Sequence, residues 1–247
     1  AIDPTTGGVL AFVSKPGCEP NCFGYGIYSE NWDLLHYSID RPLNNRALRG
    51  LYPPGSTFKP FMALAGLELK KRTPQQGISD LGYFSLPGST HRFRDWKAGG
   101  HGYVDLHKSL VVSCDTYYYG LANDLGIDNI FNFTGQFGLG KKTGIDIEGE
   151  VAGLLPSQEW KMKRYKQKWY AGDTISVGIG QGYNLATPLQ LAFATAILAI
   201  KGTAFRPHLV KPVHNNRNAE VRDTVTQPLY PTDLNPTNPT HLQNDRI

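Results

Sequence analysis

The stretch that most constrains this chain is YPPGSTFKP, residues 52–60, which leads into the apolar segment 56–71. That segment, STFKPFMALAGLELKK, has the composition and apolar face of a helix, and it closes on two lysines that suit a helix C-terminus. In such a helix Ser56 and Lys59 lie one turn apart on one face, with the serine at the positive end of the helix dipole. Pro60 fits this register, because N–H groups of the first turn have no partner inside a helix. The sequence therefore predicts a helix whose first turn presents a serine and a lysine together.

A serine and a lysine at this spacing have two interpretations. A serine alone is a weak nucleophile, but a neighbouring lysine can take its proton if desolvation or other cations lower the lysine pKa. The backbone N–H of Ser56 can also help to hold an oxyanion. The alternative is that Ser56 is an ordinary N-cap and Lys59 a surface charge, which is the commoner meaning of so short a pattern. Other motifs in the chain are needed to choose between these two interpretations.

A second serine motif, SCD at Ser113–Asp115, lies inside residues 106–126. The composition of that region predicts two short helical pieces with a break near Ser113. A serine at such a break can approach another side chain without being committed to a helix face. Ser113 is therefore a candidate partner of the first motif.

Three other regions give predictions of secondary structure. TPLQLAFATAILAIKG, residues 187–202, predicts a buried helix with Thr187 as N-cap and Pro188 in its first position. GGVLAFVSKP, residues 7–16, is apolar and ended by proline, so we expect a buried strand. Residues 205–225 suggest a strand, a turn and another strand.

The composition excludes several classes of protein. The 247 residues are 40% hydrophobic and 19% charged, as in a globular domain. A net charge of +4, spread in short clusters such as residues 161–168, is too mild to indicate nucleic-acid binding. The longest apolar run, residues 191–200, is about half of the roughly 20 residues that cross a bilayer. Residues 1–16 lack the basic start of a signal peptide. We therefore expect a soluble protein or the soluble piece of an anchored one.

Three cysteines are too few for a disulfide scaffold. Cys18 and Cys22 lie close together in a loop, PGCEPNC, and they could either pair in an oxidising compartment or remain two thiols. The sequence leaves both readings open.

The two serine motifs together resemble a known family. YPPGSTFKP resembles the first active-site motif, S-x-x-K, of the penicillin-binding proteins and serine β-lactamases, and SCD resembles their second motif, S-x-N or S-x-D. The flanking segments also resemble a transpeptidase domain, over about 200 residues and in the family's order. They are DPTTGGVLAFVSKP, NNRALRGLYPPGSTFKP, SLPGSTHRFRDWKAGGHG, GKKTGIDIEGE and GDTISVGIGQGYNLATPLQLAFATAILAIKGTAFRPHLV. The resemblance is closest to class B enzymes and, among them, to the penicillin-binding protein 2 subgroup of the elongation machinery.

The resemblance implies an α/β fold of the penicillin-binding protein transpeptidase and serine β-lactamase type, with a sheet flanked by helices. The family's third motif, K-T-G or K-S-G on a strand, has no counterpart that fits. KTG at Lys142–Gly144 matches another family segment, and KGTA at 201–204 has the wrong order. We therefore expect residues 1–247 to be a partial transpeptidase domain, incomplete at both ends, without the anchor and pedestal or the strands that carry the third motif.

The implied activity is that of a peptidoglycan D,D-transpeptidase. By resemblance, Ser56 is the nucleophile, Lys59 its base, and Ser113 and Asp115 belong to the second motif. The implied partners are D-Ala-D-Ala stem peptides, β-lactams and membrane proteins of the elongation machinery, at the periplasmic face of the inner membrane. One alternative is a β-lactamase or β-lactam sensor, although we find no base for a deacylating water. The other is a non-catalytic, zinc-stabilised binding module.

Four side chains with metal-ligand chemistry lie in and after a loop-rich stretch, namely Asp80, Asp95, His101 and Cys114. Two oxygens, an imidazole nitrogen and a thiolate suit a tetrahedral Zn²⁺ ion. Their spacing matches no short zinc-finger pattern, so the alternative is two loop caps and a small packed thiol. The resemblance favours a structural zinc, because some penicillin-binding protein 2 relatives carry one in this region.

Several nearby residues have secondary interpretations. Possible substitutes for a misassigned zinc ligand are His91, Asp105 and His107. Residues expected in the core or the cleft wall are Trp96, Tyr117, Tyr118 and Tyr119, and those expected to support the cleft floor are Asp173 and Gln181.

Overall fold

The computed structural model describes residues 1–24 and 26–210, and helices dominate this part of the chain. The helices are α1 (Asn21–Gly24), α2 (Ser29–His36), α3 (Arg46–Arg49), α4 (Lys59–Glu68), α5 (Leu106–Val111), α6 (Asp115–Leu125), α7 (Ile127–Thr134), α8 (Gln158–Tyr165), α9 (Ala171–Gly178) and α10 (Pro188–Ala199), with 3-10 turns η1 (Gly55–Phe58) and η2 (Gly135–Phe137). The predicted serine and lysine helix is therefore a 3-10 turn that continues into α4. The predicted break near Ser113 is confirmed as the gap between α5 and α6.

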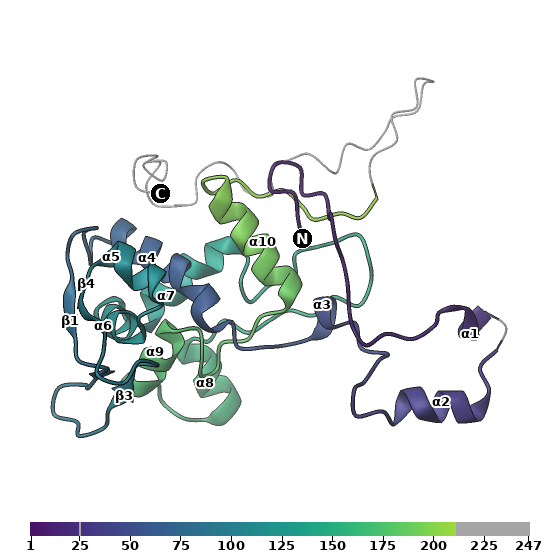
Figure 1. Cartoon of the computed structure of the whole chain (residues 1–247), viewed down its shortest axis with the longest axis horizontal. Helices are drawn as coiled ribbons and strands as arrows, with labels where there is room; N and C mark the ends of the chain where they lie inside the picture. Colours follow the sequence, from purple (N-terminus) through teal and green to yellow (C-terminus); the bar gives the residue numbers. More distant parts are fainter. Residues whose placement is uncertain (25, 211–247) are drawn as a thin grey trace.

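Sheet structure in the described ranges is limited to two short antiparallel pairs and isolated bridges. β1 (Ile78–Asp80) pairs with β4 (Gly102–Val104), with Ser79 opposite Tyr103, and β2 (Tyr83–Phe84) pairs with β3 (Phe93–Arg94). Both pairs lie at one end of the helical body, beside α5 and α6 (Figure 1).

The buried strand predicted for residues 7–16 is not formed. Gly8 and Val9 take part only in isolated bridges, to His208 and Ile2, and the side chains of Leu10 and Val13 are 74% and 70% exposed. An apolar run becomes a buried strand only where neighbouring strands and a covering layer exist. Among the described residues, only two single-residue bridges, Gly8 with His208 and Val9 with Ile2, flank the run. The second strand and turn predicted at 211–225 lie outside the described residues.

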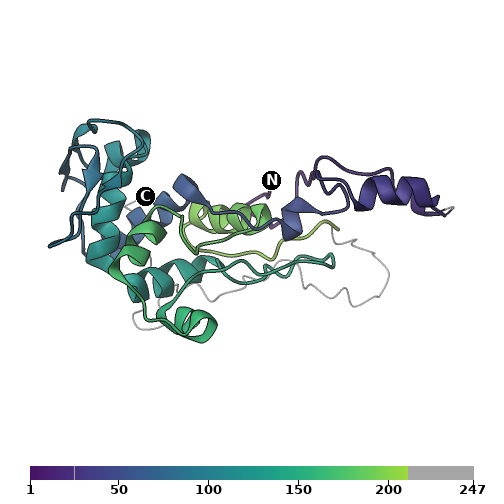
Figure 2. The same cartoon turned by 90° about the horizontal axis from the view of Figure 1, so that it is seen from below.

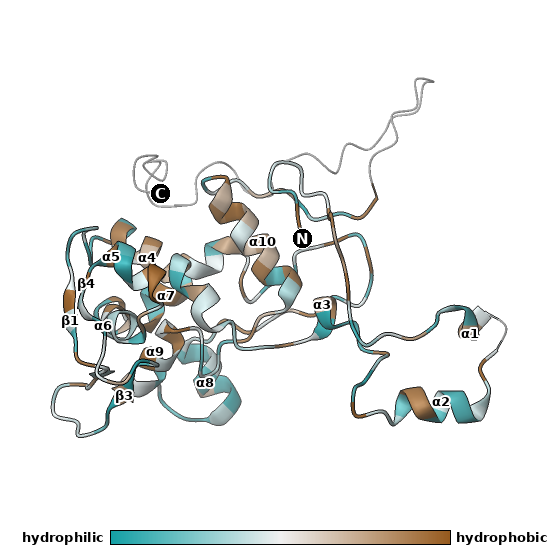
Figure 3. Ribbon diagram, in the orientation of Figure 1, coloured by the Kyte–Doolittle hydropathy of each residue, from teal (hydrophilic) through white to brown (hydrophobic). Residues whose placement is uncertain are grey.

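The core is centred on α6, which packs against α4, α7 and α9. Tyr117 and Tyr118 of α6 have no exposed surface, and Phe58, Phe61 and Ile175 are at most 1% exposed. Each such side chain contributes about 1.5–3 kcal/mol of transfer free energy when buried. Figure 3 shows many hydrophobic residues along α4, α7 and α10, whereas those of α8 are largely polar. The Ser56 turn thus begins the helix that meets the middle of this core.

Helix α10 starts as the sequence predicts. The Thr187 side chain accepts the Gln190 backbone N–H at 3.1 Å, and the Gln190 side chain accepts the Thr187 N–H at 3.0 Å. With Pro188 in the first turn, this capping box fixes the helix start.

Residues 15–24 and 26–43 form an arm that carries α1 and α2 away from the helical body (Figures 1 and 2). None of the residues in α1 or α2 is buried. The base of the arm is closed by Ser14, whose hydroxyl donates to the Asn44 carbonyl at 3.2 Å and accepts the Arg46 N–H at 3.0 Å. Cys18 and Cys22, whose pairing the sequence leaves open, are free thiols in this arm. No helix in the described residues is both long and apolar enough to span a bilayer.

Candidate active site and the adjoining ligand cluster

The turn that carries Ser56 is fixed by its backbone. The Gly55 N–H donates to the Gly180 carbonyl at 2.9 Å, and Tyr52 pairs with Ala186 through two backbone hydrogen bonds. Gly180 has a φ of +70°, and a Cβ there would lie 2.3 Å from the Gly55 carbonyl oxygen. Only glycine therefore allows the 180 turn to pack against the Ser56 turn.

Ser113 occupies the gap between α5 and α6 with a φ of +52°. This left-handed conformation is uncommon for a residue with a side chain and is found where the surrounding structure imposes it. Here the Cys114 N–H donates to the Ser109 carbonyl at 2.9 Å, which fixes the end of the gap. The result is that the Ser113 hydroxyl lies 2.8 Å from the Ser56 hydroxyl.

Lys59 is buried, with 1% of its surface exposed. Its ammonium donates to the Ser113 carbonyl at 2.8 Å, the Ser113 hydroxyl at 3.1 Å and the Asp115 carboxylate at 2.6 Å. These three acceptors use all three N–H groups of the lysine. A buried charge without a counter-charge is costly, so Asp115 in the first turn of α6 balances Lys59.

The hydrogen bonds connect Lys59 to Ser56 through Ser113. The sequence predicts that Lys59 and Ser56 share a helix face, and the structure adds the Ser113 hydroxyl between them. A hydroxyl can both donate and accept, so a proton can move along this line in either direction. The arrangement is chemically suited to activating a serine and to protonating a leaving group.

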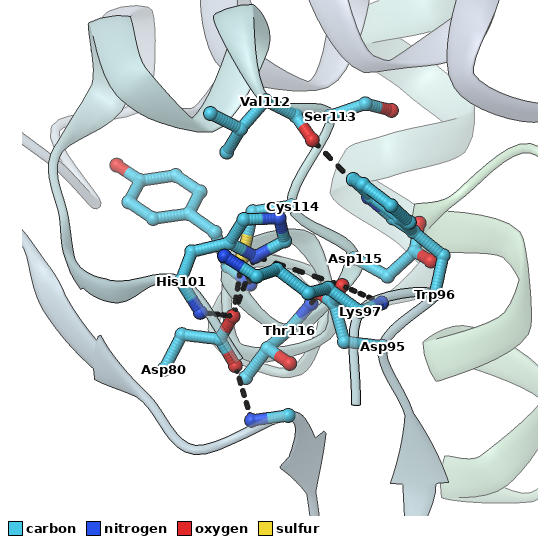
Figure 4. A network of polar contacts seen from close by, with 12 residues as sticks. Asp80, Asp95, Trp96, Lys97, His101, Val112, Ser113, Cys114, Asp115 and Thr116 are labelled. Carbon is cyan, nitrogen blue, oxygen red and sulfur yellow. Dashed lines mark hydrogen bonds and ion pairs between the residues drawn. The ribbon is translucent and has the colours of Figure 1, made fainter. Parts of the chain in front are cut away.

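The four predicted zinc ligands converge. Asp80 ends β1, Asp95 follows β3, His101 precedes β4 and Cys114 is the N-cap of α6. One ligand atom from each lies within 4.8 Å of those of the other three. Figure 4 shows Asp80, His101 and Cys114 turned toward one another directly below Ser113.

Hydrogen bonds from the backbone orient the two carboxylates. Asp80 accepts the Gly82 N–H at 2.7 Å and the His101 N–H at 2.8 Å, while His101 Nδ1 lies 2.8 Å from the same carboxylate. Burial acts to raise the pKa of Asp80, but these hydrogen bonds lower it to about 2. Asp95 accepts the Thr116 N–H at 3.0 Å. The Asp80 carboxylate is therefore ionised in a site where it is 1% exposed.

The donor set fits a zinc ion. Ligand atoms bound to one tetrahedral zinc lie roughly 3.3–3.8 Å apart, and here Cys114 Sγ lies 3.5 Å from Asp80 and His101 Nδ1 lies 3.6 Å from Asp95. Two buried carboxylates beside a thiol suit a bound cation, and His101 Nδ1 lies 2.8 Å from Asp80 and 3.6 Å from Asp95. Burial raises the pKa of the Cys114 thiol, a penalty that a bound divalent cation would reverse.

The substitute ligands are engaged elsewhere or exposed. Asp105 caps α5 by accepting the Lys108 N–H at 2.8 Å. His91 is exposed and packs edge-on against Phe93, with ring centroids 4.7 Å apart. The fold therefore brings together the four ligands first predicted, which are Asp80, Asp95, His101 and Cys114.

The KTG at residues 142–144 has a local structural role. The Thr143 N–H and hydroxyl donate to Glu150 at 2.6 and 2.8 Å, and the Gly144 N–H donates to the same buried carboxylate at 3.0 Å. The tripeptide thus forms a loop around Glu150 instead of a strand edge.

The remaining predictions have mixed outcomes. Tyr117, Tyr118 and Tyr119 lie in the core as predicted, but Trp96 is 65% exposed and its indole donates to the Val112 carbonyl at 3.1 Å. Gln181 is exposed, and its place at the cleft floor stays a prediction.

Asp173 binds Lys161, a buried lysine that the sequence does not distinguish from the exposed basic residues around it. What distinguishes Lys161 is the set of aromatic rings that surround it in the folded chain, and these rings are not adjacent to it in sequence.

Comparisons with known proteins identify the family of this chain. The family model for the penicillin binding protein transpeptidase domain matches residues 1–243. The peptidoglycan D,D-transpeptidase MrdA of Acinetobacter baumannii is 52% identical over 223 residues, which are 90% of this chain and 33% of that protein. MrdA of Haemophilus influenzae is 48% identical, over 95% of this chain and 35% of that protein. The chain therefore spans about a third of the length of these curated relatives.

Solved structures show the same fold. Pseudomonas aeruginosa PBP2 in complex with WCK 5153 superposes with a TM-score of 0.84 and 47% identity, covering 94% of this chain and 50% of that one. Helicobacter pylori PBP2 in complex with MreC has a TM-score of 0.81 and 36% identity, covering 88% and 40%.

Proposed function

The chain belongs to the family of penicillin binding protein transpeptidase domains, and on that premise we propose that Ser56 is the nucleophile of a peptidoglycan D,D-transpeptidase. The observation that carries the proposal is the hydrogen-bonded line from Lys59 through Ser113 to Ser56. An ordinary N-cap serine and surface lysine would not explain a buried lysine directed at a second serine.

The proposed reaction has two steps. The Ser56 hydroxyl attacks the carbonyl carbon between the two D-alanines of a stem peptide, an ester forms, and the amide bond breaks to release D-alanine. An amine of a second stem peptide then attacks the ester, forms the new amide and frees Ser56. β-Lactams enter the first step in place of the stem peptide and remain attached.

The site residues have distinct roles in this proposal. In its neutral form Lys59 accepts the Ser56 proton through the Ser113 hydroxyl and becomes the ammonium, and Ser113 later passes a proton from that ammonium to the leaving amine. Asp115 stabilises the charged form of Lys59 through its 2.6 Å ion pair. The Ser56 N–H, at the start of η1, is a candidate oxyanion donor.

The location and the partners of the whole protein are proposals, because the chain spans about a third of the length of its curated relatives. We propose that the whole protein acts at the periplasmic face of the inner membrane. Its proposed partners are membrane proteins of the elongation machinery. The complex of Helicobacter pylori PBP2 with MreC supports this kind of partner. The residues of a third motif are proposed to come from outside residues 1–247.

We propose further that Asp80, Asp95, His101 and Cys114 hold a structural Zn²⁺ ion. The ion would supply positive charge between two carboxylates and a thiolate, and with four protein ligands it leaves no position open for a reacting water. The side chains of this cluster then hold the β1–β4 loops against the start of α6, directly behind Ser113.

A fluorescent penicillin tests the function directly. The full-length protein should form a stable adduct that peptide mass spectrometry maps to Ser56, and a β-lactamase would instead turn the reagent over. Labelling of residues 1–247 alone tests the partial-domain proposal, because a fragment that lacks the third motif should label far more slowly. Absence of any adduct on the full-length protein would contradict the proposal.

A further inference from the structure

Lys161 is an unusual member of its basic segment. The residues around it, Lys163, Arg164, Lys166 and Lys168, are exposed, whereas the Lys161 side chain is only 2% exposed. A long lysine side chain on a surface helix normally extends its charge into water. Burial of this one charge therefore requires specific partners.

Those partners come from both ends of α9. The Lys161 ammonium lies 2.5 Å from the Asp173 carboxylate in the first turn of α9. It also lies 4.6 Å from the ring centroid of Tyr170, just before α9, and 5.5 Å from that of Tyr183, beyond its end. Attraction between a desolvated cation and ring faces adds to the ion pair. One side chain of α8 thus holds the entry and the exit of α9.

Asp173 links Lys161 to the start of α9. The same carboxylate oxygen that binds Lys161 accepts the Tyr170 N–H at 2.9 Å, and the Asp173 N–H donates to the Tyr170 carbonyl at 3.0 Å. The helix start and the buried charge therefore share one acceptor.

The other end of α9 leads to the Ser56 turn. Gly178 packs against α6 so closely that a Cβ would lie 2.4 Å from that of Ala122. Two residues later the Gly180 carbonyl accepts the N–H of Gly55, the residue directly before Ser56. Any shift of α9 along its axis would therefore move the backbone on which Ser56 stands.

We infer that Lys161 and Asp173 are positioning residues for the acylation of Ser56, an inference that rests on the proposed function. They do not contact the serine. They fix α9, and α9 fixes the glycine turn that supports the nucleophile. A displacement of a reacting group by about 1 Å can cost as much as 10²-fold in rate.

The test is the acylation kinetics of the full-length protein with a fluorescent penicillin. Lys161→Met keeps the buried stem and removes the charge, and we expect it to lower the first-order acylation constant about 10-fold while changing the non-covalent dissociation constant less than about 2-fold. Each acylation rate is divided by the fraction of the variant that is folded at the assay temperature, which a thermal melting curve measures. Lys163→Met, two residues away on the same helix and exposed, is the matched control and should acylate as the wild type does.

Rescue and coupling separate positioning from loss of fold. Lys161→Arg should recover part of the rate, and Asp173→Asn combined with Lys161→Met should slow acylation no more than the slower single variant. If Lys161→Met does not fold, Tyr183→Leu, which keeps the ion pair, should still slow acylation about 3-fold.

The outcomes distinguish the two proposals. Wild-type protein labelled at Ser56 together with a Lys161→Met variant that acylates at the wild-type rate would overturn the positioning role alone. A wild-type adduct on another residue would overturn the proposed function.

Discussion

The Ser56 centre and the cluster of Asp80, Asp95, His101 and Cys114 meet at the start of α6 but are built differently. Ser56 and Lys59 stand on helices whose other faces are buried in an aromatic and aliphatic core. Three of the four cluster residues stand on strands of two or three residues and the turns between them, Cys114 caps α6, and backbone N–H groups orient the two carboxylates. Apolar burial holds the first region. Polar contacts hold the second, which is the kind of region that gains stability from a metal ion.

The most severe test of the helical centre is Ser56→Ala. Because the hydroxyl is the proposed attacking group, we expect no covalent penicillin adduct on the full-length protein, with the melting temperature within a few degrees of the wild type. Intact-protein mass spectrometry measures the adduct. Ser79→Ala, at an exposed position of β1, is the control and should label normally. An adduct that persists on the Ser56 variant would show that Ser56 is not the nucleophile.

The next largest effect is expected for Lys59→Met, which keeps the volume of the stem but removes the amine. Acylation should slow by at least ~10²-fold, the usual cost of losing a general base. The partly buried Asp115 also loses its partner, so adding Asp115→Asn should restore stability without restoring the rate. Lys71→Met, just beyond the end of the same helix and exposed, is the control. A Lys59 variant that acylates within a few-fold of wild type would show that Lys59 is not the base.

Gly180→Ala tests the backbone that supports Ser56 instead of a side chain of the site. At a φ of +70° the new Cβ would lie 2.3 Å from the Gly55 carbonyl oxygen. We expect a loss of about 1–3 kcal/mol of unfolding free energy and acylation slowed about 10-fold. Gly149→Ala separates strain from collision, because Gly149 has a φ of +90° with no atom within 4 Å of its Cβ position. Equal acylation rates in the two variants would exclude the backbone contact as a support for Ser56.

The smallest effect on acylation is expected from metal removal. A chelator should lower the melting temperature by several degrees and slow acylation only a few-fold, without changing the labelled residue, because the cluster supports Ser113 from behind. Cys114→Ala should mimic the chelator and respond little to it, whereas Cys22→Ala should behave as wild type. Elemental analysis supplies the direct measurement, and less than ~0.2 zinc per chain in gently purified protein would rule the site out.

The two regions also differ in how far the sequence predicts them. Local rules are sufficient for the Ser56 turn, the break at Ser113 and the cap at Thr187, because each depends on side chains a few residues apart. The convergence of Asp80 with Cys114 follows from the residue types and the family resemblance, although no spacing rule indicates it. Lys161 escapes prediction because its partners, Tyr170, Asp173 and Tyr183, surround it only after α8 folds onto α9.

The predicted strand at residues 7–16 shows the opposite error. Its apolar pattern is a real local signal, but a strand exists only with neighbours, and the described residues supply one bridge on each side. Likewise, the SxxK pattern specifies that Lys59 faces Ser56 but not that Ser113 stands between them. That arrangement depends on the positive φ of Ser113, which no residue type at that position indicates.

The arm closed by Ser14 has a consequence for how this chain tolerates insertions and deletions. Since none of the residues in α1 or α2 is buried, the arm behaves as a large loop whose ends are joined where the Ser14 hydroxyl bonds Asn44 and Arg46. The entropy of closing a loop grows slowly, by only about 0.6 kcal/mol for each doubling of its length. Residues can therefore be added to or removed from the tip of the arm at small thermodynamic cost, whereas loss of the Ser14 hydroxyl would open its base.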